Sequence, residues 1–207
     1  MPNITFGRWN PTEVLERRLD NDWPSPTPYA TNLVTPTSIS STGTGNSSSI
    51  GANGSVTFSS CATLSLNGVF TSDYDNYMVV FQGIASTTHT PDFRLRASGT
   101  DASGSNYTYQ YLYGNDISLT AGRATTTVTY PASISTTREN GMTMYLYGPN
   151  LAQPTAGRSV TVAQSSGAQI WDLAWTHSLS TAYDGFSFNG GSTYTLTGLI
   201  SVYGLGV

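Results

Sequence analysis

From Val56 onward the chain alternates apolar and polar positions with a period of two, as half-buried antiparallel strands do. Clusters of Gly, Asn, Asp and Ser separate these segments, and such residues favour turns. This pattern predicts strands over 56–66, 77–85, 92–98, 107–114, 124–130, 142–148, 159–164, 168–177, 186–188 and 193–204. The number and spacing of these strands predict an all-β fold, an antiparallel β-sandwich of jelly-roll type that occupies residues 55–207.

A helical pattern occurs in NPTEVLERRLDNDWP, near the N-terminus. Asn10 can cap this helix, Pro11 suits its first position, and Glu13 completes a capping box. A helix of about three turns is not stable alone in water, so it must dock on another surface. The candidate docking residues are the apolar ones of this segment: Phe6, Trp9, Val14, Leu15, Leu19 and Trp23. The surface could belong to the chain's own β domain or to another protein, and the sequence leaves both open.

Residues 24–55 are rich in Pro, Gly, Ser, Thr and Asn, a composition that has little power to form a core. We therefore predict three parts. Residues 1–30 form an extended anchoring arm with one short helix, 31–54 form a linker, and 55–207 form the β-sandwich head.

Charge argues against a nucleic-acid partner, and the length of the apolar runs argues against a membrane. The chain has eight arginines, no lysine and twelve acidic residues, with a net charge of −4. A nucleic-acid-binding protein usually carries a basic patch or stripe, so we expect no nucleic-acid partner. No apolar run approaches the ~20 residues of a membrane-spanning helix, so we expect no membrane insertion. The N-terminus lacks the basic start and apolar core of a signal peptide, and the single Cys61 excludes an intrachain disulfide and a cysteine metal cluster.

The stretch DYDNY at 73–77 raises the question of a metal loop. An EF-hand loop needs oxygen ligands at its first, third and fifth positions and Gly at the sixth. Counting from Asp73, the fifth position is Tyr77 and the sixth is Met78, so the match fails. Asp and Asn side chains also bond to nearby backbone amides in turns. We therefore predict a turn that leads into the strand beginning at Tyr77, and we expect no metal.

Catalytic patterns are weak throughout. The two histidines, His89 and His177, belong to no nucleophile motif, and no G-x-S-x-G elbow occurs. A glycosidase needs two carboxylates flanking a sugar, and pairs such as Asp172 and Asp184 are not singled out by their spacing. We predict no catalytic residue and no cofactor, and we keep a polysaccharide-degrading enzyme as the least favoured hypothesis.

The most suggestive side chains are tyrosines on one strand face. They are Tyr107, Tyr109, Tyr111 and Tyr113, at alternate positions of YTYQYLYG. A tyrosine face offers flat apolar surface with polar tips, which suits a sugar ring. It can equally pack against a symmetry-related copy or fill an ordinary sandwich core. All three interpretations stay open, and the four tyrosines are candidates for a surface-binding site or a trimer interface.

The segment GSVTFSSCATLSLNGVFTSDYDNYMVVFQGIAS, followed by FRLRASGTDAS, resembles a region of bacteriophage virion proteins often described as tail-fibre or minor structural proteins. The ending TYTLTGLISVYGLG is similar to the last strand of such proteins, and the resemblance covers most of 54–207. The residues that carry it are Phe58, Leu66, Phe70, Tyr74, Tyr77 and Arg94. It implies a β-sandwich attached to a virion, commonly as a homotrimer.

We therefore expect a non-enzymatic virion protein, assembled in the host bacterial cytoplasm, with other virion proteins as partners. The arm would dock on the virion, and the head would be displayed as a tail fibre or tail-tip protein that contacts a glycan or protein on the host surface. The alternative is a capsid decoration (cement) protein or head fibre.

Overall fold

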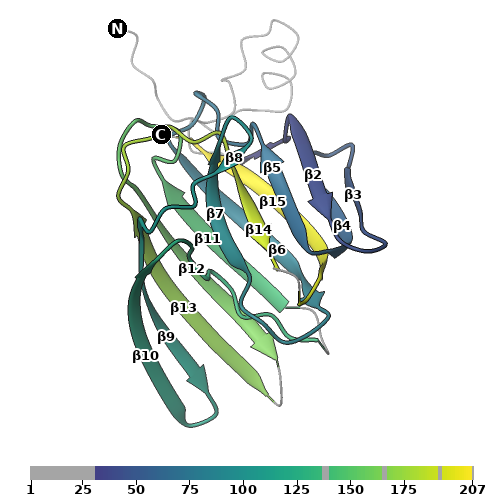
Figure 1. Cartoon of the computed structure of the whole chain (residues 1–207), viewed down its shortest axis with the longest axis vertical. Coiled ribbons are helices and arrows are strands. Elements are labelled where there is room, and N and C mark those ends of the chain that lie inside the picture. Colours follow the sequence, from purple (N-terminus) through teal and green to yellow (C-terminus); the bar gives the residue numbers. More distant parts are fainter. Residues whose placement is uncertain (1–30, 137–139, 165–166, 191–192, 207) are drawn as a thin grey trace, which may run out of the picture.

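The computed structural model describes residues 31–136, 140–164, 167–190 and 193–206. These residues form two antiparallel sheets, which confirms the predicted all-β sandwich (Figure 1). The strands are β1 (Thr31–Val34), β2 (Ser38–Thr42), β3 (Ser47–Ile50), β4 (Val56–Cys61), β5 (Thr63–Asn67), β6 (Asn76–Ala85), β7 (Asp92–Ala97), β8 (Thr100–Asp101), β9 (Tyr107–Asn115), β10 (Ser118–Thr126), β11 (Asn140–Tyr147), β12 (Thr155–Gln164), β13 (Ala168–His177), β14 (Gly185–Asn189) and β15 (Leu196–Leu205).

The two sheets differ in size. The large sheet has ten strands, in the order β10-β9-β13-β12-β11-β6-β15-β4-β3, with β1 also paired to β15. The small sheet has five strands, in the order β2-β5-β14-β7-β8. The chain crosses between the sheets several times, as in jelly-roll-like sandwiches. The large sheet has twice as many strands and extends beyond the small sheet on the side of β9, β10, β12 and β13 (Figure 1). We call these four strands the sheet extension. Only one end of β9 and β13, at Tyr107 and Trp175, packs against the small sheet.

The structure corrects the predicted linker. Residues 31–54 contain β1, β2 and β3, which pair with β15, β5 and β4. β2 and β3 are rich in Ser and Thr and lie at sheet edges, where hydroxyl groups pair across strands. The Thr42 and Thr63 hydroxyl oxygens, for example, lie 2.6 Å apart. Val34 is buried, and Ile39 and Ile50 pack against the core. The β domain therefore includes residues 31–54.

Two of the predicted strands are also corrected. The predicted strand 56–66 is divided into β4 and β5, which belong to different sheets. Ser60 has a φ of 53°, a left-handed conformation that interrupts the extended backbone where the chain crosses over. The predicted strand 124–130 corresponds to β10, which ends at Thr126. Residues 127–136 then cross the inner face of the large sheet and bond to it, for example through the Thr161 hydroxyl, which donates to the Pro131 carbonyl over 3.1 Å. We call residues 127–136 the covering segment.

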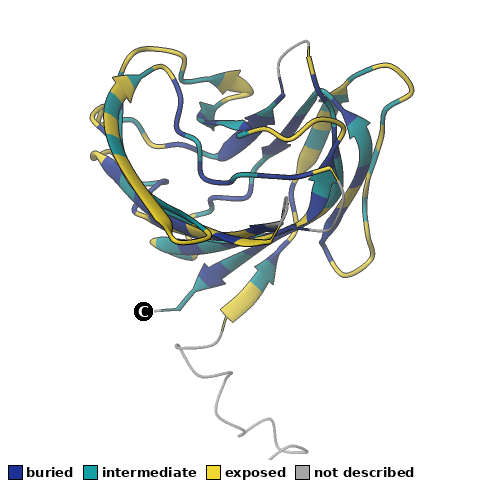
Figure 2. Cartoon of the chain, turned by 90° about the horizontal axis from the view of Figure 1, so that it is seen from below, coloured by how far each residue is buried: buried dark blue, intermediate teal, exposed yellow. Residues whose placement is uncertain are grey.

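The core lies between the sheets and is rich in aromatic residues. Figure 2 shows the buried positions of the facing strands in dark blue. Phe93 of β7 is at the centre of the core. Its ring lies 5.4 Å from Phe186, 5.5 Å from Phe188 and 5.6 Å from Trp175, measured between centroids. Trp175 belongs to the large sheet, so this cluster joins the two layers.

Candidate interaction surfaces

The tyrosines of β9 all lie on the inner face of the large sheet, but they do not share one environment. Tyr107 is fully buried, with no exposed surface. Its hydroxyl oxygen accepts a hydrogen bond of 2.9 Å from the Leu95 amide, and burial raises the pKa of its phenol. Tyr107 is therefore a core residue that joins the two sheets and is not available to a ligand or a partner chain.

The other three tyrosines are partly exposed and form an aromatic surface together with Trp171 of β13. Tyr111 stacks on Trp171 with ring centroids 4.6 Å apart and an interplanar angle of 11°. The Tyr113 ring lies 5.6 Å from the same indole, and Tyr109 packs edge-on against Tyr130 of the covering segment. We call Tyr109, Tyr111, Tyr113 and Trp171 the aromatic row.

Hydrogen bonds and a glycine fix the geometry of the aromatic row. The Trp171 Nε1–H donates to the Tyr130 carbonyl over 3.1 Å, which holds the indole under the covering segment. Gly122 of β10 lies directly opposite Tyr111, and a Cβ atom at this position would lie 2.6 Å from the Tyr111 hydroxyl oxygen. Only glycine therefore lets the Tyr111 ring lie across β10.

The chemistry of the aromatic row suits binding of a flat, polar molecule. Desolvation raises the pKa of the Tyr109 phenol, so its hydroxyl stays neutral and can both donate and accept a hydrogen bond. Beyond Tyr113, the Gln169 side-chain amide donates to the Asn115 side-chain oxygen over 3.1 Å and extends the row with amide groups. Aromatic faces beside hydroxyl and amide groups match the alternating apolar and polar surfaces of a sugar.

The stretch 73–77 is a turn that leads into β6, as predicted, with the strand beginning at Asn76. Tyr77 is buried, and its hydroxyl both accepts from the Thr71 amide and donates to the Thr71 carbonyl, each over 2.7 Å. The Tyr77 hydroxyl thus fixes the position of Thr71, in the loop that precedes β6. In the described residues, no three His, Cys, Asp or Glu side chains gather as a metal site would require.

The acidic and thiol groups considered from sequence have separate structural roles. Asp172, on β13, forms a salt bridge of 2.8 Å with Arg158, and this hydrogen bond lowers the pKa of its carboxyl. Asp184 instead accepts a hydrogen bond of 3.0 Å from the Ser98 amide, beside β7 of the small sheet. The structure does not bring these two carboxylates into one site. The Cys61 thiol is buried, and burial raises its pKa, as expected of an inert core cysteine.

His177 is a fully buried histidine with no charged neighbour to compensate a proton in the described part of the chain. Its ring packs edge-on against Tyr107 and Tyr183, and its Nδ1 lies 3.2 Å from the Tyr183 hydroxyl. Its Nε2 has no hydrogen-bond partner among the described residues. Burial disfavours the imidazolium and lowers the pKa of His177 below its usual 6.5.

We expect this burial to make the fold sensitive to acid. Below about pH 6.5 the unfolded chain binds a proton at His177 that the folded chain resists. The free energy of unfolding should then fall by up to about 1.4 kcal/mol per pH unit until the folded-state pKa is passed. Urea unfolding between about pH 7 and pH 5 measures this slope. His177→Gln, which cannot titrate, should have a shallower slope; an equal slope in both proteins would exclude His177 as the cause.

The candidate docking residues of the arm, from Phe6 to Trp23, lie outside the described residues. Within the described ranges there is no helix long and apolar enough to span a membrane. A scan against protein-family models finds no match for this sequence, and a search of curated proteins finds none either.

Proposed function

We propose that this chain is a non-enzymatic structural protein of a bacteriophage virion, in which the arm docks on another virion protein and the β-sandwich is displayed. Its preferred place is a tail fibre or tail tip, where the head binds a glycan or protein of the host surface. A homotrimer is the expected assembly.

The observation that carries this proposal is the aromatic row on the sheet extension. Tyr111, Tyr113 and Trp171 lie on regular strands, where hydrogen-bonded neighbours and the covering segment hold them in place. A prearranged aromatic surface of this kind binds a ligand with little loss of conformational freedom. It has no adjacent pair of carboxylates in the described residues, so it supports recognition of a glycan better than its cleavage.

The resemblance to phage virion proteins supports the proposal through the fold. Phe58, Leu66, Phe70 and Tyr77 are all buried, and Tyr74 packs against the core. Arg94 is placed by a hydrogen bond from its Nε–H to the Thr127 carbonyl, at the start of the covering segment. The shared residues therefore specify the sandwich and its covering segment, and they leave the surface free to differ.

Copy number tests the proposed location. Quantitative mass spectrometry of purified particles of the phage that encodes this chain should find it in a small number of copies, and gold-labelled antibody should mark the tail tip. Many copies spread over the shell would instead favour the capsid decoration or head-fibre alternative. Absence of the chain from particles would contradict the virion proposal.

Binding of the purified protein to host cells tests the aromatic row. Tyr113→Ala should weaken binding by about tenfold, because the ring is the accessible end of the row. Tyr113→Phe keeps the flat ring and should retain most of the affinity. Tyr147→Ala removes an exposed tyrosine from the opposite face of the sheet and is the matched control. Equal binding by the Tyr113→Ala and Tyr147→Ala variants would exclude the aromatic row as the host-binding surface.

A further inference from the structure

The outer face of the large sheet carries the apolar residues that a sandwich normally turns inward. On β12, Ser159 and Thr161 are buried in the interior, whereas Val160 and Val162 face outward and are 42% and 56% exposed. Strands of a sandwich usually place the aliphatic side inward and the polar side in water. The inversion on β12 indicates that the outer face is covered by something in the functional protein.

Neighbouring strands extend this apolar surface across the sheet. Cross-strand pairing places one outward row over seven strands, in the order Leu119, Gly114, Ile170, Val162, Gly141, Gln82 and Leu199. Leu112, Val160 and Val80 lie on the adjacent row. We call these two rows the outer apolar face. Ile170 is 58% exposed and Leu119 is 74% exposed, so large aliphatic groups stand in water.

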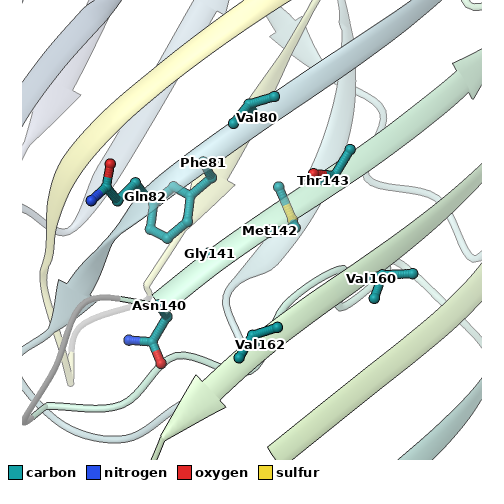
Figure 3. A pocket seen from close by; sticks show the side chains of 9 residues that line it. All are labelled: Val80, Phe81, Gln82, Asn140, Gly141, Met142, Thr143, Val160 and Val162. Atoms are coloured by element: carbon teal, nitrogen blue, oxygen red, sulfur yellow. The ribbon is translucent and has the colours of Figure 1, made fainter.

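Two glycines make hollows between these aliphatic side chains. A Cβ atom at Gly114 or at Gly141 would meet nothing within 4 Å, and neither glycine has a left-handed φ that would require it. Figure 3 shows Gly141 between Gln82 of β6 and Val162 of β12, in an open hollow of about 610 Å³. A mid-strand glycine without a local structural need often marks the close approach of another chain. Along the row, the two hollows therefore flank the aliphatic side chains of Ile170 and Val162.

Charge on this face is low and is already paired near the centre. Arg158 and Asp172 form a two-fold hydrogen-bonded salt bridge, with distances of 3.1 Å and 2.8 Å. Arg123 lies on β10, at the edge of the sheet. A partner that covered the outer apolar face would therefore not bury an unpaired charge at the centre. This charge pattern does not suit an anionic lipid surface, which is recognised by clusters of basic residues.

We propose that the outer apolar face is the interface between copies of this chain. A row in which hollows lie beside aliphatic projections can pair with the same row of a second copy, so that the Val162 or Ile170 side chain of one copy enters a glycine hollow of the other. Sheets packed face to face in this way lie about 10 Å apart. A face that pairs with itself joins copies two at a time, so this interface predicts a dimer or a larger even-numbered assembly in place of the homotrimer. The inference rests on the proposed function only for the expectation of a homo-oligomer.

The size of the face suits a specific interface. Strands lie about 4.8 Å apart and outward residues about 6.8 Å apart along a strand, so the two rows from β10 to β15 cover roughly 450 Å² in projection. The next outward row, which includes Tyr145 and Arg158, brings the projected area to roughly 700 Å². Specific interfaces bury about 800 Å² per partner, which this area approaches before the relief of the side chains is added.

Light scattering of the purified full-length chain tests the proposal. At micromolar concentration the mass should be twice 22.0 kDa or a higher even multiple of it, because a self-complementary face pairs copies two at a time. Val162→Glu should raise the dissociation constant at least about 100-fold, because the interface would bury a carboxylate with no partner. Gly141→Ala should also weaken the oligomer while leaving the thermal unfolding of the monomer intact, because the added methyl group enters the hollow and meets nothing of its own chain within 4 Å.

Matched variants distinguish the outer apolar face from other surfaces that could hold copies together. Leu179→Glu changes a leucine that is 43% exposed and lies in the loop after β13, so it should leave the mass unchanged. A monomeric or trimeric wild-type protein, or a Val162→Glu protein of wild-type mass, would overturn the proposal. Dissociation by Leu15→Glu as strong as by Val162→Glu would also overturn it, because the arm would then be what covers the face. Each of these outcomes is read in the purified protein, so failure here is distinct from failure to enter virions.

Discussion

Replacing Phe93 by alanine should destabilise the β-sandwich by about 3–5 kcal/mol. Phe93 is fully buried and contacts Phe186 and Phe188 of the small sheet and Trp175 of the large sheet. Removal of its ring leaves a cavity where the two layers meet, and the rigid strands on both sides cannot close it. A domain of this size has a total stability of about 5–15 kcal/mol, so the variant is expected to lose a large part of it.

Urea unfolding monitored by tryptophan fluorescence measures this loss. Tyr147→Ala is the control, since it removes an aromatic ring of similar size that is 48% exposed. The control should change the free energy of unfolding by less than about 0.5 kcal/mol. A loss below about 1 kcal/mol for Phe93→Ala would mean that the two sheets are not joined through this cluster.

Gly198→Ala should cost about 3 kcal/mol, although it adds a single methyl group. Gly198 of β15 lies directly opposite Gly83 of β6, in the middle of the large sheet. A Cβ atom at Gly198 would overlap the Gln82 carbonyl oxygen and approach the Gly83 Cα atom to 2.8 Å. These are backbone atoms of a paired strand, which cannot move aside as a flexible side chain could. The strands must separate, and hydrogen bonds between β6 and β15 are lost.

The matched control is Gly114→Ala, near the end of β9. It adds the same methyl group where a Cβ atom meets nothing of its own chain within 4 Å, so unfolding of the monomer should be unchanged or slightly more difficult. Thermal unfolding of both variants, followed by circular dichroism at low protein concentration, makes the comparison. If the two variants unfold at the same temperature, the close approach of β6 and β15 is not as tight as the geometry indicates.

Local sequence patterns predicted most of the sandwich because apolar and polar residues alternate along most of its strands. β6, β9 and β13 agree with their predicted ranges to within one residue, since each has a long alternating run. Residues 31–54 were missed because β1 and β2 pair with the distant strands β15 and β5, and because β3 is the polar strand of a hairpin with β4. Their Ser and Thr residues show no alternation of apolar and polar positions. Pairing such as that of Thr31 with Leu205 joins residues far apart in the sequence, and a local pattern cannot predict it.

For the candidate surfaces, too, the local pattern was predictable from the sequence and the long-range contacts were not. The sequence placed the tyrosines of β9 on one face, and the structure agrees. It could not separate Tyr107 from Tyr113, because what covers Tyr107 is the Leu95 backbone of the other sheet. The sequence also could not predict that the valines of β12 face outward. In SVTVAQ the period of two is clear, but which side faces the interior depends on the register of β11 and β13, and a slip of one residue would exchange the two faces.

The pairing of β1 with β15 brings Thr31 and Leu205 together at one end of the molecule, and we call this end and the opposite end its two poles. Thr31, where the arm joins the sandwich, lies beside Leu205, near the C-terminal end of the chain. The hairpin between β9 and β10 lies at the far end of the large sheet from this corner (Figure 1). A ten-residue strand such as β13 spans about 34 Å, so attachment at one pole holds the opposite pole well away from the support. A reporter attached beside Leu205 would therefore lie close to Thr31 and leave the hairpin between β9 and β10 free, whereas one inserted beside Ile117 would do the reverse.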